Sequence, residues 1–178
     1  MRLKTRLAAA AGAVLLGLGL AVAVQSPASA TAGLWLGPVR LRAFNTNLCA
    51  DVRNYSLNEG ALFQLWQCIP DQRNQQFWLV TTDTPWLYQI RPVHSGGGMC
   101  MDVKDVSMYD GAQIQQWNCL GWWQYNQYFY DVDAGGGYSY LQAKHSGKCV
   151  TFYYPPTQGQ DLLQNTCFSY SFGKWAIE

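Results

Sequence analysis

The residues Gly111-Ala112-Gln113-Ile114-Gln115-Gln116-Trp117-Asn118-Cys119 occur in similar form at two other places in the chain. The earlier copy is Gly60-Ala61-Leu62-Phe63-Gln64-Leu65-Trp66-Gln67-Cys68, and the later copy is Gly159-Gln160-Asp161-Leu162-Leu163-Gln164-Asn165-Thr166-Cys167. Each copy places a glycine eight residues before a cysteine. Self-similarity of this kind is the signature of a repeat architecture.

The six cysteines follow the same repeat. They form successive pairs 19, 19 and 18 residues apart, and the first members are offset by 51 and then 49 residues: Cys49 and Cys68, Cys100 and Cys119, Cys149 and Cys167. The first cysteines begin Cys49-Ala50-Asp51-Val52, Cys100-Met101-Asp102-Val103 and Cys149-Val150-Thr151-Phe152. Each repeat closes on an aromatic residue, in Gln76-Phe77-Trp78, Gln127-Tyr128-Phe129 and Gly173-Lys174-Trp175. A period near 50 residues predicts three copies of one unit, with Trp78, Phe129 and Trp175 in the core.

The repeated stretch alternates as a β-strand does. In a strand Gln115 and Trp117 point to one face, whereas Ile114 and Gln116 point to the other. Runs rich in glycine, such as Ser95-Gly96-Gly97-Gly98, predict the turns between such strands. Beyond the first thirty residues, no segment sustains an apolar period of 3.6 residues, so the sequence predicts an all-β domain.

The first thirty residues have the pattern of a secretory signal peptide. Arg2, Lys4 and Arg6 form a basic start, Leu7 to Val24 is almost wholly apolar, and Ala28-Ser29-Ala30 resembles a cleavage site. The alternative is a membrane anchor, because an apolar run of about 18 residues is borderline for a span. Its alanine and glycine content is weakly hydrophobic and no basic cluster follows, so we expect residues 1–30 to be cleaved from a secreted, extracellular protein.

Composition limits the class of partner. Of the 178 residues, 49% are hydrophobic and 13% are charged, which excludes a highly charged disordered chain. Without residues 1–30, nine Lys and Arg remain against eleven Asp and Glu, a net charge of −2. This charge offers no electrostatic footprint for nucleic acid, and we expect no membrane partner after cleavage. All six cysteines lie in this mature part, where an oxidising exterior favours disulfides.

Three Cys-x-Asp…Gln-x-Trp-x-Cys…Gln-x-Trp repeats resemble the ricin B-type lectin family, also called the QxW or family 13 carbohydrate-binding fold. The resemblance covers residues 37–178, in repeats at about 37–84, 85–135 and 136–178, after a short tail at 31–36. It implies a β-trefoil, a six-stranded barrel capped by three hairpins. It also implies one disulfide within each repeat, whereas the spacing alone leaves 15 pairings open.

The chemistry that a sugar requires is present in two repeats. A pyranose has hydroxyls that donate and accept hydrogen bonds and a C–H face that packs on an aromatic ring. Asp102 would accept bonds from two hydroxyls, Gln115 and Asn126 would orient them, Trp117 would be the stacking platform, and Gln127 would brace the carboxylate or the sugar. The resemblance implies binding residues at Asp102, Gln115, Trp117, Asn126, Gln127, Asp51, Gln64, Trp66, Gln75 and Gln76.

The repeats differ from one another in these positions. The first departs from the family pattern at Gln75, where the family usually has asparagine. The third has Thr151, Leu163 and Asn165 in place of the acid, the amide and the aromatic residue, so we expect it not to bind. The competing interpretation is that the two aspartates cap turns and the two tryptophans are packing residues.

Catalysis finds little support in the sequence. A glycosidase needs two positioned carboxylates, and the only glutamates are Glu59 and Glu178, in no recognisable motif. No nucleophile elbow, zinc-protease motif or phosphate-binding loop occurs, so we expect no catalytic residue, no metal and no cofactor. His94 and His145 stand at matching places before Ser-Gly and are interpreted as turn residues.

The segment Trp122-Trp123-Gln124-Tyr125 lies in the loop after Cys119. It is either a hydrophobic plug beneath that loop or extra aromatic surface for a glycan or a protein. The leading hypothesis is therefore a carbohydrate-binding protein for galactose- or xylose-type sugars. The alternative is a protein-interaction or toxin-delivery subunit that acts with a separate secreted enzyme or toxin chain.

Overall fold

The computed structural model describes residues 32–167 and 173–178. The expected signal peptide at 1–30 lies outside these residues. In chain order the strands are β1 (Trp35–Val39), β2 (Leu41–Ala43), β3 (Leu48–Val52), β4 (Phe63–Gln67), β5 (Phe77–Thr81), β6 (Leu87–Pro92), β7 (Met99–Val103), β8 (Ala112–Asn118), β9 (Phe129–Gly135), β10 (Tyr138–Ala143), β11 (Cys149–Thr151), β12 (Leu163–Asn165) and β13 (Lys174–Ile177). Single 3₁₀ turns lie between them: η1 (Arg53–Tyr55), η2 (Arg73–Gln75), η3 (Val93–Ser95), η4 (Lys104–Val106) and η5 (Tyr125–Gln127).

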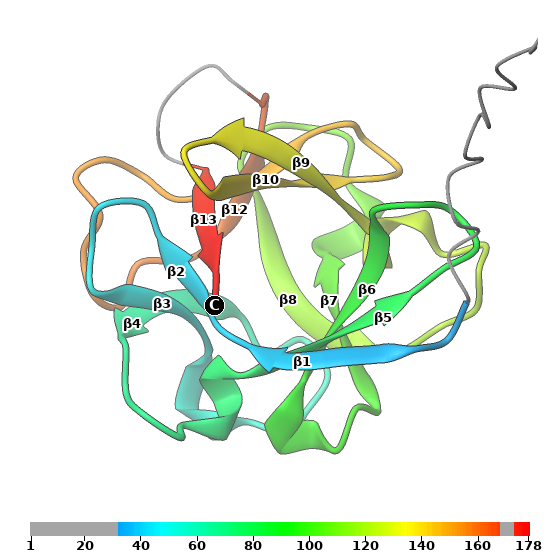
Figure 1. Ribbon diagram of the computed structural model, residues 1–178, viewed down its shortest axis with the longest axis horizontal. Helices are drawn as coiled ribbons and strands as arrows, with labels where there is room; N and C mark the ends of the chain where they lie inside the picture. The colour runs from blue at the N-terminus through cyan, green and yellow to red at the C-terminus, as the bar shows by residue number, and fades with distance from the viewer. Residues whose placement is uncertain (1–31, 168–172) are drawn as a thin grey trace, which may run out of the picture.

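Six strand positions close into a barrel (Figure 1). The strands β5, β6, β9, β10 and β13 pair in that order, all antiparallel. The ring closes through β1 and β2, which are separated only by Arg40, because β1 pairs with β5 and β2 pairs with β13. A closed barrel leaves no unpaired edge to template aggregation.

Each repeat adds a hairpin to this barrel. The hairpins are β3–β4, β7–β8 and β11–β12. In each, the first cysteine of the repeat is the first or second residue of the first strand. The six-stranded barrel with three hairpins confirms the predicted all-β trefoil. Among the described residues, no helix has the length and apolar character needed to cross a bilayer.

The core is formed where the barrel strands and hairpins meet. Phe63, Phe77, Phe129 and Trp175 are all fully buried there. Trp78 was predicted to be the core aromatic of the first repeat, and this was wrong, because Trp78 is only half-buried and packs edge-on against Trp35. Successive residues of a strand face opposite sides, so the inward position in β5 belongs to Phe77.

The disulfides are those that the family resemblance implied. Cys49–Cys68, Cys100–Cys119 and Cys149–Cys167 are bonded, each with Cα atoms 5.0 Å apart. Each bridge closes a loop of fewer than twenty residues, and such a loop contributes about 3 kcal/mol by restricting the unfolded chain. The bridges therefore hold each hairpin to the turn that follows it.

The expected tail at 31–36 overlaps the barrel. The first strand begins at Trp35, which pairs with Val80, and the amide of Gly33 donates to the carbonyl of Thr81. The main chain of this segment is thus held by β5, although Trp35 and Leu36 keep 47% and 43% of their surface exposed.

Two histidines join neighbouring repeats. His94 Nε2 lies 2.8 Å from the carbonyl oxygen of Ser56, and His145 Nε2 lies 2.9 Å from that of Ser107. As expected, both are turn residues, since His94 lies within η3 and His145 within a tight turn, but each also contacts a loop of the preceding repeat. Burial lowers the pKa of both imidazoles below the usual 6.5. Below pH 6.5 the unfolded chain then binds more protons than the folded chain, so stability falls as pH drops from 6.5 through the lowered pKa values of the folded state.

Candidate functional site

The first candidate site is built around the carboxylate of Asp51, which is 96% buried near the loop end of the β3–β4 hairpin. Asp51 stands opposite Gln64 in the ladder, and Gln64 Nε2 donates to Oδ1 at 2.9 Å. The other oxygen, Oδ2, accepts from Asn74 Nδ2 at 2.9 Å and from Gln75 Nε2 at 3.0 Å. Three amide donors therefore fix one acidic group.

The second site repeats this arrangement closely. Gln115 Nε2 donates to Asp102 Oδ1 at 3.0 Å, while Asn126 and Gln127 donate to Oδ2 at 2.8 and 3.0 Å. Asn126 also donates to the carbonyl of Val103, just as Asn74 donates to that of Val52. The same constellation at two places in one molecule is a property of the repeat.

The first repeat contains an asparagine that sequence reasoning missed. Counting from the cysteine matched Gln75 and Gln76 to Asn126 and Gln127, but the loop after Cys68 is one residue shorter. The structure instead aligns Asn74 with Asn126 and Gln75 with Gln127. Hence Gln75 is no departure from the family pattern. The sequence signal that identifies Asn74 is the dipeptide Asn-Gln, which both repeats contain, and not the number of residues after the cysteine.

Gln76, predicted to be a site residue, lies outside the cluster. It is half-buried, and its hydrogen bonds within the described residues are main-chain bonds to Arg73 and Val93. Gln75 and Gln127 are fully buried, and each also bonds the turn after its disulfide. These two glutamines therefore brace the carboxylate and have no surface to offer a ligand.

Replacing Asn74 by alanine is expected to weaken ligand binding at the first site, whereas replacing Gln76 by alanine is expected to leave it unchanged. Asn74 Nδ2 donates to Asp51 Oδ2 at 2.9 Å, so its removal leaves the carboxylate that a ligand hydroxyl would meet less firmly held. Loss of one such bond costs about 1 kcal/mol, a several-fold rise in Kd. Titration of a single-site protein with Asp102→Asn in the background checks this. If both substitutions weaken binding equally, the alignment of Asn74 with Asn126 is wrong.

The two tryptophans of the sites are half-buried. Trp66 stands two residues beyond Gln64 on the same face of β4, and Trp117 has the same relation to Gln115 in β8. Each indole therefore keeps part of its surface open to solvent, as a stacking platform requires. A hollow of about 300 Å³ adjoins Trp66 and is lined also by Asp51, Gln64, Asn74 and Tyr55. Tyr55, with 44% of its surface exposed, is a second ring at this site that the sequence did not indicate.

The sites differ in the basic residue that follows the strand. Arg53 Nε donates to Gln64 Oε1 at 3.0 Å, and its Nη2 pairs with Asp161 of the third repeat at 2.5 Å. In the second site Lys104 instead contacts Gln113 at 3.5 Å. The side chain of Gln64 is therefore held at both its oxygen and its nitrogen, whereas that of Gln115 is bonded, within the described part of the chain, only through its amide nitrogen.

The third repeat has a different set of contacts. Asn165 Nδ2 donates to Thr151 Oγ1 at 2.6 Å, and Thr151 Oγ1 in turn bonds the carbonyl of Leu163. Asn165 Oδ1 accepts from the amide of Gly111. Neutral side chains that satisfy one another fill the position that a carboxylate and an indole fill elsewhere.

Both carboxylates are electrostatically unusual. Burial raises the pKa of Asp51 and of Asp102 above the ordinary 3.8, and the three amide hydrogen bonds to each lower it only in part. The neighbouring Asp105 raises the pKa of Asp102 further. A buried carboxylate with fixed donors is a strong acceptor for hydroxyl groups, because charge-assisted bonds are stronger than neutral ones.

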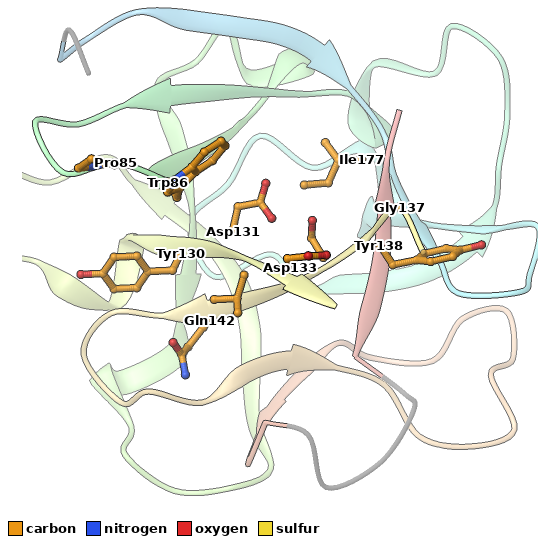
Figure 2. A pocket seen from close by; sticks show the side chains of 11 residues that line it. Pro85, Trp86, Tyr130, Asp131, Asp133, Gly137, Tyr138, Gln142 and Ile177 are labelled. Atoms are coloured by element: carbon orange, nitrogen blue, oxygen red, sulfur yellow. The ribbon is translucent and has the colours of Figure 1, made fainter. Parts of the chain in front are cut away.

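A separate hollow of about 800 Å³ lies on the barrel wall. Figure 2 shows Asp131 and Asp133 near its centre, with Trp86 on one side and Tyr138 on another. It shares no residue with the two Asp-centred sites. Over the described part of the chain, no group of three or more His, Cys, Asp or Glu side chains is arranged to hold a metal ion.

Comparisons with known proteins agree with this architecture. The family model described as "Ricin-type beta-trefoil lectin domain" matches residues 37–173. The designed three-fold symmetric protein ThreeFoil is 28% identical with a TM-score of 0.71, covering 78% of this chain and 96% of that one. An exo-β-1,3-galactanase from Clostridium thermocellum is 26% identical with a TM-score of 0.68, covering 79% of this chain and 30% of that one.

A third structure shares the fold. The agglutinin from Abrus precatorius is 20% identical with a TM-score of 0.66, and the match covers 83% of this chain and 49% of that one. Among curated protein sequences, no match to the chain is found.

Proposed function

The chain belongs to the ricin-type β-trefoil lectin family, and from that membership we propose that it is a secreted sugar-binding protein without catalytic activity. Its ligands are galactose- or xylose-type sugars, bound in shallow sites in the first and second repeats. Membership in this family supports carbohydrate binding in general. The type of sugar and its location in the first and second repeats are what we propose beyond family membership.

One observation carries the proposal. A buried carboxylate held by three amides occurs twice at equivalent places. In each repeat a half-buried indole follows two residues along the strand from one of these amides, on the same face. Core packing does not require such a group, since burying a charge costs free energy unless it is paired. A ligand with vicinal hydroxyls and an apolar face uses both parts of the arrangement, because the hydroxyls reach the carboxylate and the C–H face covers the ring.

The proposed sites are weak singly and stronger together. A shallow site for one sugar typically has a Kd on the order of 1 mM, which is about −4 kcal/mol. Two such sites on a rigid, disulfide-bonded barrel gain affinity for a polymer that can reach both of them. The exo-β-1,3-galactanase among the similar structures supports galactose as the first sugar to test, because that enzyme acts on a galactan.

The proposal is tested by retention of the folded protein on a glycan array and on insoluble galactan and xylan. We expect retention on galactose- or xylose-containing ligands that free galactose or xylose at tens of millimolar reverses. The variant Thr151→Ala, in the third repeat, should be retained as the wild type is. Absence of retention on every ligand, with an intact near-UV spectrum, would overturn the proposal.

Binding is expected to fall on acidification with a midpoint above pH 3.8. Because burial raises the pKa of Asp51 and Asp102, each carboxylate is protonated at a higher pH than a free aspartate is. A protonated carboxyl loses the charge that strengthens its bonds to sugar hydroxyls. Titration of Kd between pH 7 and pH 4, with circular dichroism at each point, separates this effect from unfolding. Binding that persists unchanged to pH 3.8 would contradict it.

Secretion has support that is independent of the sugar sites. Three disulfides are consistent with an oxidising exterior, where such bonds persist. The proposed cleavage after Ala30 is tested by N-terminal sequencing of the protein recovered from culture medium. A role beside a separate secreted enzyme is the second candidate, because Trp122 and Trp123 keep 71% and 63% of their surface exposed.

A further inference from the structure

The exposed loop after Cys119 borders a hollow of about 630 Å³ that differs from both Asp-centred sites. Trp122 and Tyr125 of this loop line one part of it, and Arg91 of β6 and Lys144, which follows β10, line another. The loop is therefore not a plug that fills a gap, because Trp122 keeps 71% of its surface in solvent. The hollow has cations, hydroxyl groups and an available indole face.

Lys144 supplies an available positive charge. Its ammonium lies 4.1 Å from the ring centroid of Tyr125 and 6.0 Å from that of Tyr128. No ion pair among the described residues includes Lys144. The two rings position the ammonium through cation–π attraction without neutralising it.

Arg91 supplies a second charge. Its guanidinium lies 5.1 Å from the ring centroid of Trp35 and donates to the carbonyl of Gly97 and to Gln89 Oε1. Its Nε is buried and has no partner among the described residues. Within the lining of this hollow, the one acidic side chain is Asp83, which Thr84 contacts at 3.4 Å, so the lining carries a net positive charge.

We propose that this hollow binds an acidic saccharide, a sugar that carries a carboxylate as a uronic acid does. The carboxylate is recognised by Lys144 together with Arg91, and the sugar ring packs against the exposed face of Trp122. The inference deepens the proposed function, on which it rests, by assigning the ligand class next to the second repeat. A simple anion would leave the indole unused, and a neutral sugar would leave the cations unpaired.

One turn and one chain of hydrogen bonds link the hollow to the second site. The turn η5 places Tyr125 in the hollow and the next residue, Asn126, on the Asp102 carboxylate. A polar chain also joins them: Arg91 donates to Gln89, Gln89 to the carbonyl of Leu120, the Leu120 amide to Gln127, and Gln127 to Asp102. In this proposal, an acidic residue of a glycan binds in the hollow while a neutral residue of the same glycan binds at the second site.

The test compares two ligands of identical linkage, trigalacturonate and its carboxyl-reduced form, a neutral galactotriose. With the wild type at low salt, we expect trigalacturonate to bind about tenfold more tightly, and we expect the difference to vanish at about 1 M salt. Lys144→Met should bring the ratio close to one without changing the Kd for the neutral ligand. Trp122→Ala should weaken trigalacturonate binding several-fold.

Two matched variants control for charge and for surface aromatics. Lys148→Met removes a lysine that pairs with Asp110 elsewhere on the surface, and Trp86→Ala removes an indole of similar exposure from the hollow in Figure 2. Both should keep the wild-type ratio. Equal binding of the two ligands by the wild type, or an equal loss in Lys148→Met, would overturn the inference.

The design separates this inference from the proposed function. If Asp51→Asn with Asp102→Asn leaves trigalacturonate binding intact while Lys144→Met removes it, the hollow stands as an independent site. If the neutral ligand binds but no preference for the acidic one exists, the inference alone falls. Capture of a protein through Trp122, with no preference between the ligands, would likewise exclude the acidic saccharide.

Discussion

Asp102→Asn is expected to abolish sugar binding at the second site while the barrel stays folded. A charge-assisted bond to a hydroxyl contributes about 1.5–3 kcal/mol, so its loss raises a millimolar Kd by about tenfold to a hundredfold, beyond measurement. On a polymer, retention should then fall to that of the first site alone, because avidity needs both. Isothermal titration and galactan retention measure the two effects.

The same change in the first repeat is expected to cost more stability. In the second site Gln115 can turn its amide so that its oxygen faces the new amide group, since only its nitrogen is bonded to Asp102. In the first site Gln64 is held at both ends, by Asp51 and by Arg53, so the same rotation breaks the bond to Arg53. Asp51→Asn should therefore lower the melting temperature more than Asp102→Asn does.

Trp117→Ala is the companion variant for the second site, since it removes the proposed stacking ring and leaves the carboxylate and its donors in place. If Asp102→Asn and Trp117→Ala both fold and both bind the neutral ligand as the wild type does, the carboxylate and the indole are structural. The assignment of sugar binding to this repeat would then be wrong.

Trp175→Ala is expected to destabilise the whole barrel without touching either site. Trp175 is fully buried, packs edge-on against Phe152 at 5.4 Å, and donates from Nε1 to the carbonyl of Val150. Removing a buried tryptophan costs about 3–5 kcal/mol, against a total stability of about 5–15 kcal/mol. At about 3 °C per kcal/mol for a chain of this size, the melting temperature should fall by roughly 10–15 °C.

Trp122→Ala is the matched control for that measurement. Its indole is 71% exposed, and substitutions at such positions usually change stability by less than about 0.5 kcal/mol. Thermal unfolding followed by near-UV circular dichroism, with the disulfides intact, compares the two variants. Similar melting temperatures for the two variants would show that β13 contributes little to the core.

The first repeat shows where prediction from sequence stopped. The cysteine spacing and the flanking residues predicted the repeat, and the resemblance to the lectin family implied the trefoil and the members of the second site. In the first site, the pair of residues after the second cysteine was predicted one residue too late, because the loops after Cys68 and Cys119 differ in length. That slip placed Gln76 in the site and Trp78 in the core, whereas the structure places Asn74 and Phe77 there.

Residue types that recur at a fixed period were enough to predict three copies of one β unit, because each repeat must bury the same inward face against its neighbours and so repeats its pattern. The resemblance of those residues to the lectin family then implied the trefoil. Tertiary structure decided whatever is assembled from segments far apart in the chain. The ring closure of β1 and β2 with β5 and β13, and the bond between Arg53 and Asp161, are of this kind. So is the convergence of Arg91, Trp122 and Lys144 on one hollow. The spacing of such residues along the chain carries no signal, since only the folded barrel brings their side chains within reach of one another.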